Sequence, residues 1–366
     1  MSKRAHVYYF DYLRVMAAIG VIYMHTAAGP LRKEINLDWQ AENLVTCFSF
    51  TAVPLFFMMS GYLLMSSEKT ADVSALFKKR IPHLLIPLIG WTGVAILWNM
   101  YYYKNFSFKY LYDQFVSSLS SPAKIHFWYM YTLIALYILS PIIYSALHSL
   151  DRKGHILVIA LISLVSLKHI LKALTPASFD RYLEIDIINK MTFLGGHASS
   201  FVLGWYLGNI KKKIPNSLLF TAAALVLGII TIGTYILSKR SGTLNQTFQS
   251  QSAGFEVLLA AIIFIIFKQN ANKPSKVLKH IPLVPLSLSI YLMHNILLNI
   301  MSTAGLSINT FLDTIFITFL NLFICLIVMK TVATIKPLCF IATGMSYKTA
   351  CETCNWVWTY KKYFKK

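Results

Sequence analysis

Long apolar runs alternate with short polar connections along most of the chain. A helix needs about 20 consecutive, mainly apolar residues to cross the hydrocarbon core of a bilayer. Ten runs approach that length, although the fifth and eighth are short, and they occupy residues 7–27, 44–66, 82–103, 126–147, 155–172, 191–210, 217–238, 253–268, 280–301 and 309–334. The pattern therefore predicts an all-α, polytopic membrane helix bundle of about ten transmembrane helices. We expect one transmembrane domain over residues 1–334 and a basic tail over residues 335–366.

The composition agrees with this membrane class. Of the 366 residues, 56% are hydrophobic and only 13% are charged, whereas about a quarter of the residues in a soluble protein are charged. Aromatic residues make up 14% of the chain, and Trp and Tyr are enriched where a membrane meets water. The connections between the apolar runs are too short to hold a soluble domain.

The distribution of basic residues predicts the orientation. If the N-terminus is placed on one side, that side receives most of the 34 lysines and arginines. The other side receives fewer of them and several acids, including Glu34, Asp38 and Glu42. Because cytoplasmic loops carry the excess of Lys and Arg, we expect both termini in the cytoplasm.

The formal net charge of +20 does not indicate nucleic-acid binding. The positive charge is spread over the predicted cytoplasmic loops and the tail segment "YKKYFKK", which suits attraction to anionic lipid headgroups. The first run could imitate a signal peptide, with "MSKR" as its basic start. Asp11, Arg14 and His25 make a poor apolar region for a signal peptide, so we interpret the run as a retained helix.

Five cysteines add little to the functional picture. Cys351 and Cys354 form a Cys-x-x-Cys pair in the predicted tail. A lone pair of this kind is weak evidence for zinc or redox chemistry. We therefore predict no metal site, and the role of the pair stays open.

The first run carries an arginine and a histidine eleven residues apart, Arg14 and His25. At 100° per residue this spacing is three turns plus about 20°, so the two side chains share one helix face about 16 Å apart. An arginine within a span costs roughly 2–3 kcal/mol on insertion scales and usually faces a bundle interior or a watery cavity. In the simpler alternative Arg14 snorkels to the headgroups and pairs with Asp11, and His25 is an interfacial residue. The shared face favours a functional path.

The segment "DYLRVMAAIGVIYMH" resembles the first-helix signature of the acyltransferase 3 family of membrane acyltransferases, in which Arg is followed by ten residues and then His. Further pieces follow in the family's order: "VPLFFMMSGYLL", "FKKRIPHLLIPL", "HFWYMYTLIALYILSPII", "FVLGWYLG" and "SLSIYLMHNILL". The resemblance covers residues 8–330, including the ten spans. Within the family, the chain is similar to the stand-alone O-acetyltransferases of bacterial surface polysaccharides such as the enterobacterial common antigen. In the second piece, Ser60 and Gly61 would allow close contact between helices.

The resemblance implies an O-acyltransferase of the bacterial inner membrane. Its donor would be cytoplasmic acyl-CoA, in particular acetyl-CoA, with no bound cofactor. Its acceptor would be a hydroxyl of a cell-surface glycan or of an undecaprenyl-linked saccharide. Arginine and lysine suit phosphate, so Arg14, Arg80 and Lys79 are expected to hold the CoA phosphates. The family often has Arg-x-x-Arg at the start of the third helix, and here His83 replaces the second arginine. His83 is therefore also a candidate for donor binding, with Lys78 or Lys79 as residues that would share its role.

His25, at the outer end of the first span, is the expected catalytic residue. A hydroxyl needs a general base to attack a thioester, and the pKa of histidine suits that role near neutrality. In the alternative mechanism His25 carries the acyl group covalently, and the sequence leaves both mechanisms open.

Four further residues are candidates for secondary roles: Asp11, His126, Trp128 and His294. His294, in "YLMHN", resembles a recurring histidine of the family, with packing or an interhelical hydrogen bond as the alternative. His126 and Trp128 begin the fourth run at the outer boundary, where anchoring in the interface is the default reading and a substrate contact is the alternative.

Two other functional classes compete with the enzyme. A polar path through ten helices could export a polysaccharide or a lipid-linked glycan without chemistry. A membrane-anchoring or sensory domain is the weaker option, because no appended soluble domain is evident. The spacing of Arg14 and His25 favours the enzyme, since export needs no base aligned with a phosphate-binding arginine.

Overall fold

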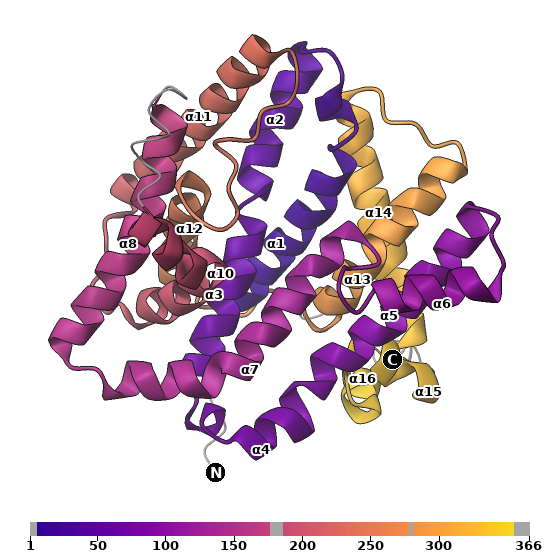
Figure 1. Cartoon of the computed structure of the whole chain (residues 1–366), viewed down its shortest axis with the longest axis horizontal. Coiled ribbons are helices and arrows are strands. Elements are labelled where there is room, and N and C mark those ends of the chain that lie inside the picture. Colours follow the sequence, from indigo (N-terminus) through magenta and orange to yellow (C-terminus); the bar gives the residue numbers. More distant parts are fainter. Residues whose placement is uncertain (1–5, 176–185, 277, 279–280, 355–366) are drawn as a thin grey trace. The chain divides into compact units, whose positions relative to one another are not determined.

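The structure, a computed structural model, describes residues 6–175, 186–276, 278 and 281–354, with the backbone alone over 186–195. Within these ranges every regular element is a helix (Figure 1). The prediction of an all-α fold is therefore confirmed.

Each of the ten predicted apolar runs corresponds to a helix. These helices are α1 (Tyr8–Thr26), α3 (Ala52–Met65), α5 (Pro82–Tyr102), α7 (Trp128–Ser149), α8 (Arg152–Leu174), α10 (Asp186–Asn209), α11 (Asn216–Ser241), α12 (Phe255–Asn270), α13 (Leu283–Thr303) and α14 (Phe311–Val332). The remaining α-helices are shorter: α2 (Leu37–Ser49), α4 (Val73–Ala75), α6 (Phe108–Ser117), α15 (Lys336–Thr343) and α16 (Tyr347–Cys354).

In the described part of the chain, seven helical segments are long and apolar enough to cross a membrane. They are Leu37–Met65, Val73–Tyr102, Ile125–Ser149, Arg152–Leu174, Asn216–Ser241, Leu283–Thr303 and Phe311–Val332. Among the others, α12 has only 16 residues, and α1 carries Asp11, Arg14 and His25. The chain is thus a multi-pass membrane protein. The count of ten spans and the cytoplasmic placement of the termini stay predictions.

Polar side chains fix where several helices begin. The Asn36 side chain accepts a hydrogen bond from the Trp39 amide at 2.9 Å at the start of α2. Asp151 accepts one from the Gly154 amide at 2.8 Å at the start of α8. Each cap pairs a backbone N–H that the first helical turn leaves without an acceptor.

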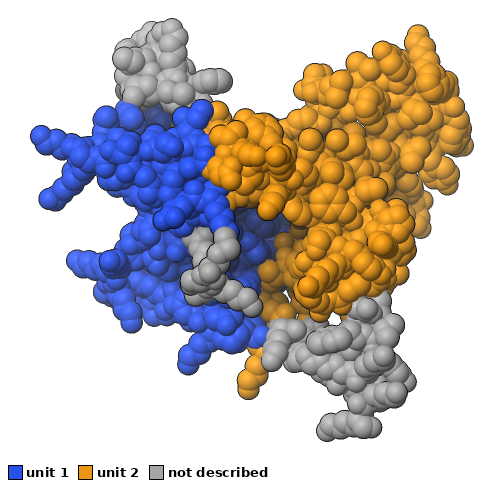
Figure 2. All heavy atoms as spheres, turned by 90° about the horizontal axis from the view of Figure 1, so that it is seen from below, with its two compact units in different colours: residues 1–71, 140–275, 308–315 blue, residues 72–139, 276–307, 316–366 orange. Residues whose placement is uncertain are grey.

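The helices group into two compact units, coloured separately in Figure 2. Unit 1 comprises Met1–Ala71, Ser140–Ser275 and Ile308–Ile315, and unit 2 comprises Asp72–Leu139, Lys276–Ser307 and Phe316–Lys366. The unit boundaries fall within α7 and α14. The domain limits expected from the sequence, 1–334 and 335–366, remain a prediction.

Unit 1 is centred on α3 and α10, which touch backbone to backbone. A Cβ atom added to Gly61 of α3 would lie 1.7 Å from the carbonyl oxygen of Phe201 in α10. A Cβ atom on Gly204 of α10 would lie 2.0 Å from the carbonyl oxygen of Met58 in α3. The expectation that Gly61 permits close helix contact is confirmed, because no larger side chain fits between these backbones.

Unit 2 is organised around α5, which packs against α13 and α15. The Trp91 indole N–H donates a hydrogen bond to the Ala342 carbonyl oxygen at 3.0 Å. Gly344, with φ 69°, ends α15 in the left-handed conformation that glycine adopts readily. The described part of the predicted tail therefore begins with α15, which packs on α5, and continues with α16, which packs on α15.

Candidate active site

The residues expected to be functional are divided between the two units. Asp11, Arg14 and His25 belong to unit 1. The others belong to unit 2, and they are Lys79, Arg80, His83, His126, Trp128 and His294. Each group is described within its own unit.

Helix α1 holds Arg14 and His25 on one uninterrupted stretch of α-helix. The helix buries Leu13, Ala17 and Val21, which lie one turn apart and face α1's neighbours in unit 1. Because α1 is continuous, the two side chains differ by about 20° around the helix axis and about 16 Å along it. Both are half-buried.

Asp11 lies at the start of α1, as expected for an acid near a helix N-terminus. Its Oδ2 atom is 2.6 Å from Nε2 of His6. His6 is well exposed and precedes the helix. Asp11 thus links the beginning of α1 to the residues before it.

A buried carboxylate network lies near the C-terminal end of α1, and the sequence pattern did not reveal it. Glu42 is 1% exposed, and its Oε2 accepts a hydrogen bond from the Tyr23 hydroxyl at 2.8 Å. The Thr314 hydroxyl donates to the other oxygen, Oε1. The charge distribution places Glu42 with the exposed acids Glu34 and Asp38, but α2 begins at Leu37 and Glu42 is a buried residue of this helix.

A second buried polar cluster connects α2 to α11 and to the segment before α12. The Gln249 amide donates to Sγ of Cys47 at 3.2 Å, and the Asn43 amide donates to the Thr231 carbonyl oxygen at 2.9 Å. Glu256 is fully buried, and neither of its carboxyl oxygens has a hydrogen-bond partner among the described residues. Glu256 was missed although an ionisable residue within an apolar run is itself a signal of function.

In unit 2, the structure brings His126 and His294 together. Their ring centroids are 4.7 Å apart and the rings meet edge to face. The two residues are 2% and 0% exposed, which favours a role within the protein over anchoring of His126 in the interface. Nε2 of His126 lies 3.3 Å from the Leu292 carbonyl oxygen, so this nitrogen carries the proton that it donates.

The surroundings of this histidine pair come from α7, α13 and α14. The Tyr291 hydroxyl donates to the His126 carbonyl oxygen, and the Asn321 amide donates to the His294 carbonyl oxygen at 2.9 Å. Trp128 begins α7 and is half-buried, with its ring 6.4 Å from that of Tyr129. These contacts fix the backbone that positions both histidines.

The basic cluster precedes α5. Leu76–Arg80 forms a turn of π-helix, a local feature that is frequent at functional sites. Lys79 is exposed and Arg80 is half-buried. The Nδ1 atom of His83 contacts the Gly344 carbonyl oxygen, and its ring lies 5.2 Å from that of Phe340. His83 therefore helps to hold α15 on α5.

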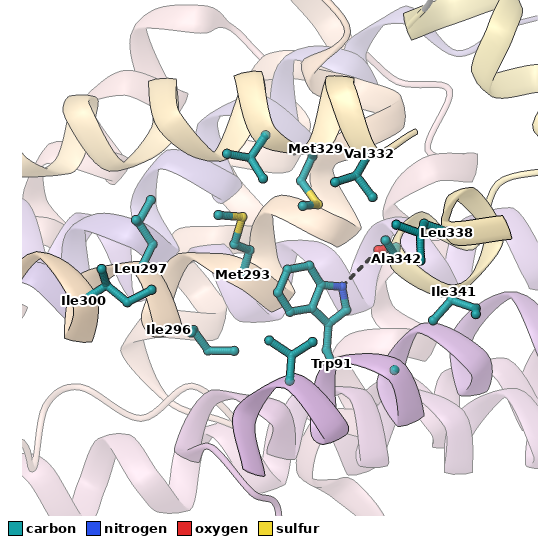
Figure 3. A pocket seen from close by; sticks show the side chains of 13 residues that line it. Trp91, Met293, Ile296, Leu297, Ile300, Met329, Val332, Leu338, Ile341 and Ala342 are labelled. Atoms are coloured by element: carbon teal, nitrogen blue, oxygen red, sulfur yellow. Dashed lines mark hydrogen bonds between the residues drawn. The ribbon is translucent and has the colours of Figure 1, made fainter. Parts of the chain in front are cut away.

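An apolar cavity of about 340 Å³ lies between α5, α13, α14 and α15 (Figure 3). The Trp91 ring points into it from α5, and Met293 and Met329 line it from α13 and α14. None of its lining residues is titratable, so it contributes packing space but no acid or base. In the described ranges, no three His, Cys, Asp or Glu side chains gather to hold a metal ion.

Comparison with known proteins gives one match. A family described as an acyltransferase domain matches residues 7–330, which is nearly the whole chain. No curated protein and no solved structure matches.

Proposed function

Because the chain belongs to the acyltransferase 3 family, we propose that it transfers an acyl group, in particular acetyl, from cytoplasmic acyl-CoA to a glycan hydroxyl. The glycan is a cell-surface polysaccharide or its undecaprenyl-linked precursor, and the protein works in the bacterial inner membrane. The observation that carries this proposal is the placement of Arg14 and His25 on one face of a continuous α1. They stand about 16 Å apart along the helix axis.

Arginine at the predicted cytoplasmic end suits the donor. The phosphates of CoA are strongly anionic, and the planar guanidinium group of Arg14 can donate two parallel hydrogen bonds to one phosphate. Arg80 and Lys79 have the charge to bind further phosphates. The narrow pantetheine arm would carry the thioester along α1 toward His25.

Histidine at the other end suits the chemistry. As a general base, neutral His25 takes the proton of the acceptor hydroxyl while the hydroxyl oxygen attacks the thioester carbonyl carbon. The carbon–sulfur bond then breaks, and the thiolate of CoA takes the proton back from His25. As an acyl carrier, His25 would attack the thioester carbonyl carbon, and the carbon–sulfur bond would break to release CoA. The acceptor hydroxyl would then attack the acyl-imidazole, the carbon–nitrogen bond would break, and the hydroxyl proton would pass to the freed imidazole nitrogen.

The Arg14→Ala variant is expected to bind acyl-CoA roughly 10- to 100-fold more weakly, because hydrogen bonds to charged groups contribute about 1.5–3 kcal/mol. Arg14→Lys should recover part of this loss, since a point charge replaces the two-pronged donor. Isothermal titration calorimetry with CoA measures the affinity of both variants. Arg152→Ala, at the exposed start of α8, is the matched control. If a folded Arg14→Ala protein binds CoA with wild-type affinity, Arg14 does not hold the donor and the snorkelling interpretation stands.

One observation favours export without chemistry as the second candidate. Glu42 and Glu256 are buried carboxyl groups in unit 1, and ionisable groups inside membrane proteins often belong to substrate or proton paths. An exporter, however, has no need of the aligned arginine and histidine. Transport of an unmodified glycan by a protein that transfers no acyl group would decide for this candidate.

A further inference from the structure

A second, polar cavity of about 230 Å³ lies in unit 2, where α5 and α13 end. Its lining includes Trp98, Asn99 and Tyr102 from the last turns of α5, and Asn299 and Ser302 from the end of α13. Lys124, which precedes the short helix Ile125–Phe127, completes this group. The cavity is small, so it suits one compact polar group rather than a large ligand.

The side chains in this cavity offer both hydrogen-bond donors and acceptors. In the part of the chain that the structure describes, the side chains of Asn99, Lys124 and Ser302 make no hydrogen bond to protein. The Asn299 amide N–H donates to the Asn295 carbonyl oxygen at 3.1 Å, which leaves its own oxygen as an acceptor. A ligand here must therefore both donate and accept.

This mixture selects between two kinds of polar ligand. An ionised phosphate group has far more acceptor than donor capacity, so it would leave the acceptor oxygen of Asn299 poorly paired. A sugar hydroxyl donates one hydrogen bond and accepts others, as does a serine hydroxyl. The rings of Trp98 and Tyr102, whose centroids are 6.3 Å apart, add an apolar surface for the C–H face of a sugar ring.

Lys124 adds a positive charge to this cavity. Burial lowers the pKa of its ammonium group, and no acid among the described residues forms an ion pair with it. An oxygen ligand would replace the lost hydration of this group. The same segment places His126 two residues further on, in ring contact with His294.

From this arrangement we propose that the cavity between the ends of α5 and α13 is a saccharide subsite, which holds one neutral or acidic sugar unit of the acceptor. The assignment of that sugar to the acceptor rests on the proposed function. The ends of α5 and α13 are also the ends that the distribution of basic residues predicts to lie outside, where a glycan acceptor is available.

Direct binding tests the subsite without any transfer reaction. The full-length protein is placed in lipid nanodiscs, because glycoside detergents would compete for the site. N-acetylglucosamine, glucuronic acid and inorganic phosphate are the probes, and saturation-transfer NMR is the readout. We expect the sugars to bind, and Asn99→Ala and Ser302→Ala each to weaken binding roughly three- to ten-fold, the usual effect of one hydrogen bond. Ser120→Ala, at an exposed serine outside the cavity, should match wild type.

Sugar binding that neither variant alters would overturn the subsite, as would displacement of the bound sugar by phosphate. Thermal melting of each variant checks that it is folded. Trp98→Phe keeps an aromatic ring in the cavity, so this variant should bind the sugars more tightly than Trp98→Ala. A tryptophan with only a structural role would not produce this difference in affinity.

Kinetics separate this inference from the proposed function. In a transfer assay, Asn99→Ala should raise the KM for the glycan three- to ten-fold and leave kcat and the KM for acyl-CoA unchanged. If wild type transfers acyl groups and Asn99→Ala has the wild-type KM for the glycan, the assignment of the subsite is wrong and the proposed function stands. If the sugars bind with the expected variant pattern but wild type transfers nothing, the subsite stands and the function is wrong.

Discussion

The His25→Ala variant is expected to lose acyl transfer by roughly 10²- to 10⁴-fold, the usual contribution of a general base. It should bind CoA and accumulate in the membrane as wild type does. The reason is positional, because His25 lies about 16 Å along α1 from Arg14 and is too far to contact the diphosphate held there. Loss of a packing histidine would instead reduce stability.

The measurement is acetylation of the glycan in a knockout strain complemented with each variant, with membrane abundance quantified in parallel. His148→Ala is a suitable control, because His148 is an exposed histidine near the end of α7. Wild-type acetylation by His25→Ala would remove His25 from the mechanism.

The Gly61→Ala variant is expected to disrupt unit 1. The added Cβ atom would lie 1.7 Å from the Phe201 carbonyl oxygen, and a backbone atom in a packed helix cannot rotate away as a side chain can. The cost should reach or exceed the roughly 1–3 kcal/mol typical of overpacking. It should also outweigh the gain of about 1 kcal/mol that Ala has over Gly within a helix.

Fluorescence-detected size-exclusion chromatography after heating measures this effect as a lower melting temperature and a smaller folded fraction. Gly93→Ala is the matched control, since a Cβ atom at Gly93 of α5 meets nothing within 4 Å. A melting temperature for Gly61→Ala equal to that of Gly93→Ala would contradict the backbone contact between α3 and α10.

The helices were predictable because hydrophobicity along the chain reports what a bilayer requires of each segment. All ten apolar runs are helical, including the residues around Arg14 and His25. The polar half of α2 was not recognised, since Glu42 and Asn43 reduce its hydropathy. Their burial together with Trp39 and Thr46 follows the spacing of one helix face, which is the signal that could have revealed it.

The contacts of the candidate site could not be predicted, because they join residues far apart in the chain. Glu42 meets Thr314 across 272 positions, and His126 meets the α13 backbone across 166 positions. Hydropathy orders the helices along the sequence but gives no information on which faces meet. His83 illustrates the limit, since the sequence gives no sign of its contact with the Gly344 carbonyl oxygen, 261 positions away. Its expected role in donor binding stays a prediction.

The central claim, acyl transfer, is tested most directly by incubating the purified protein with radiolabelled acetyl-CoA and a panel of cell-surface glycans or their lipid-linked precursors. We expect wild type to move the label to a glycan hydroxyl and the His25→Ala protein not to do so. Wild-type protein that moves no label to any glycan, yet carries an unmodified glycan across reconstituted vesicles, would contradict it and identify an exporter.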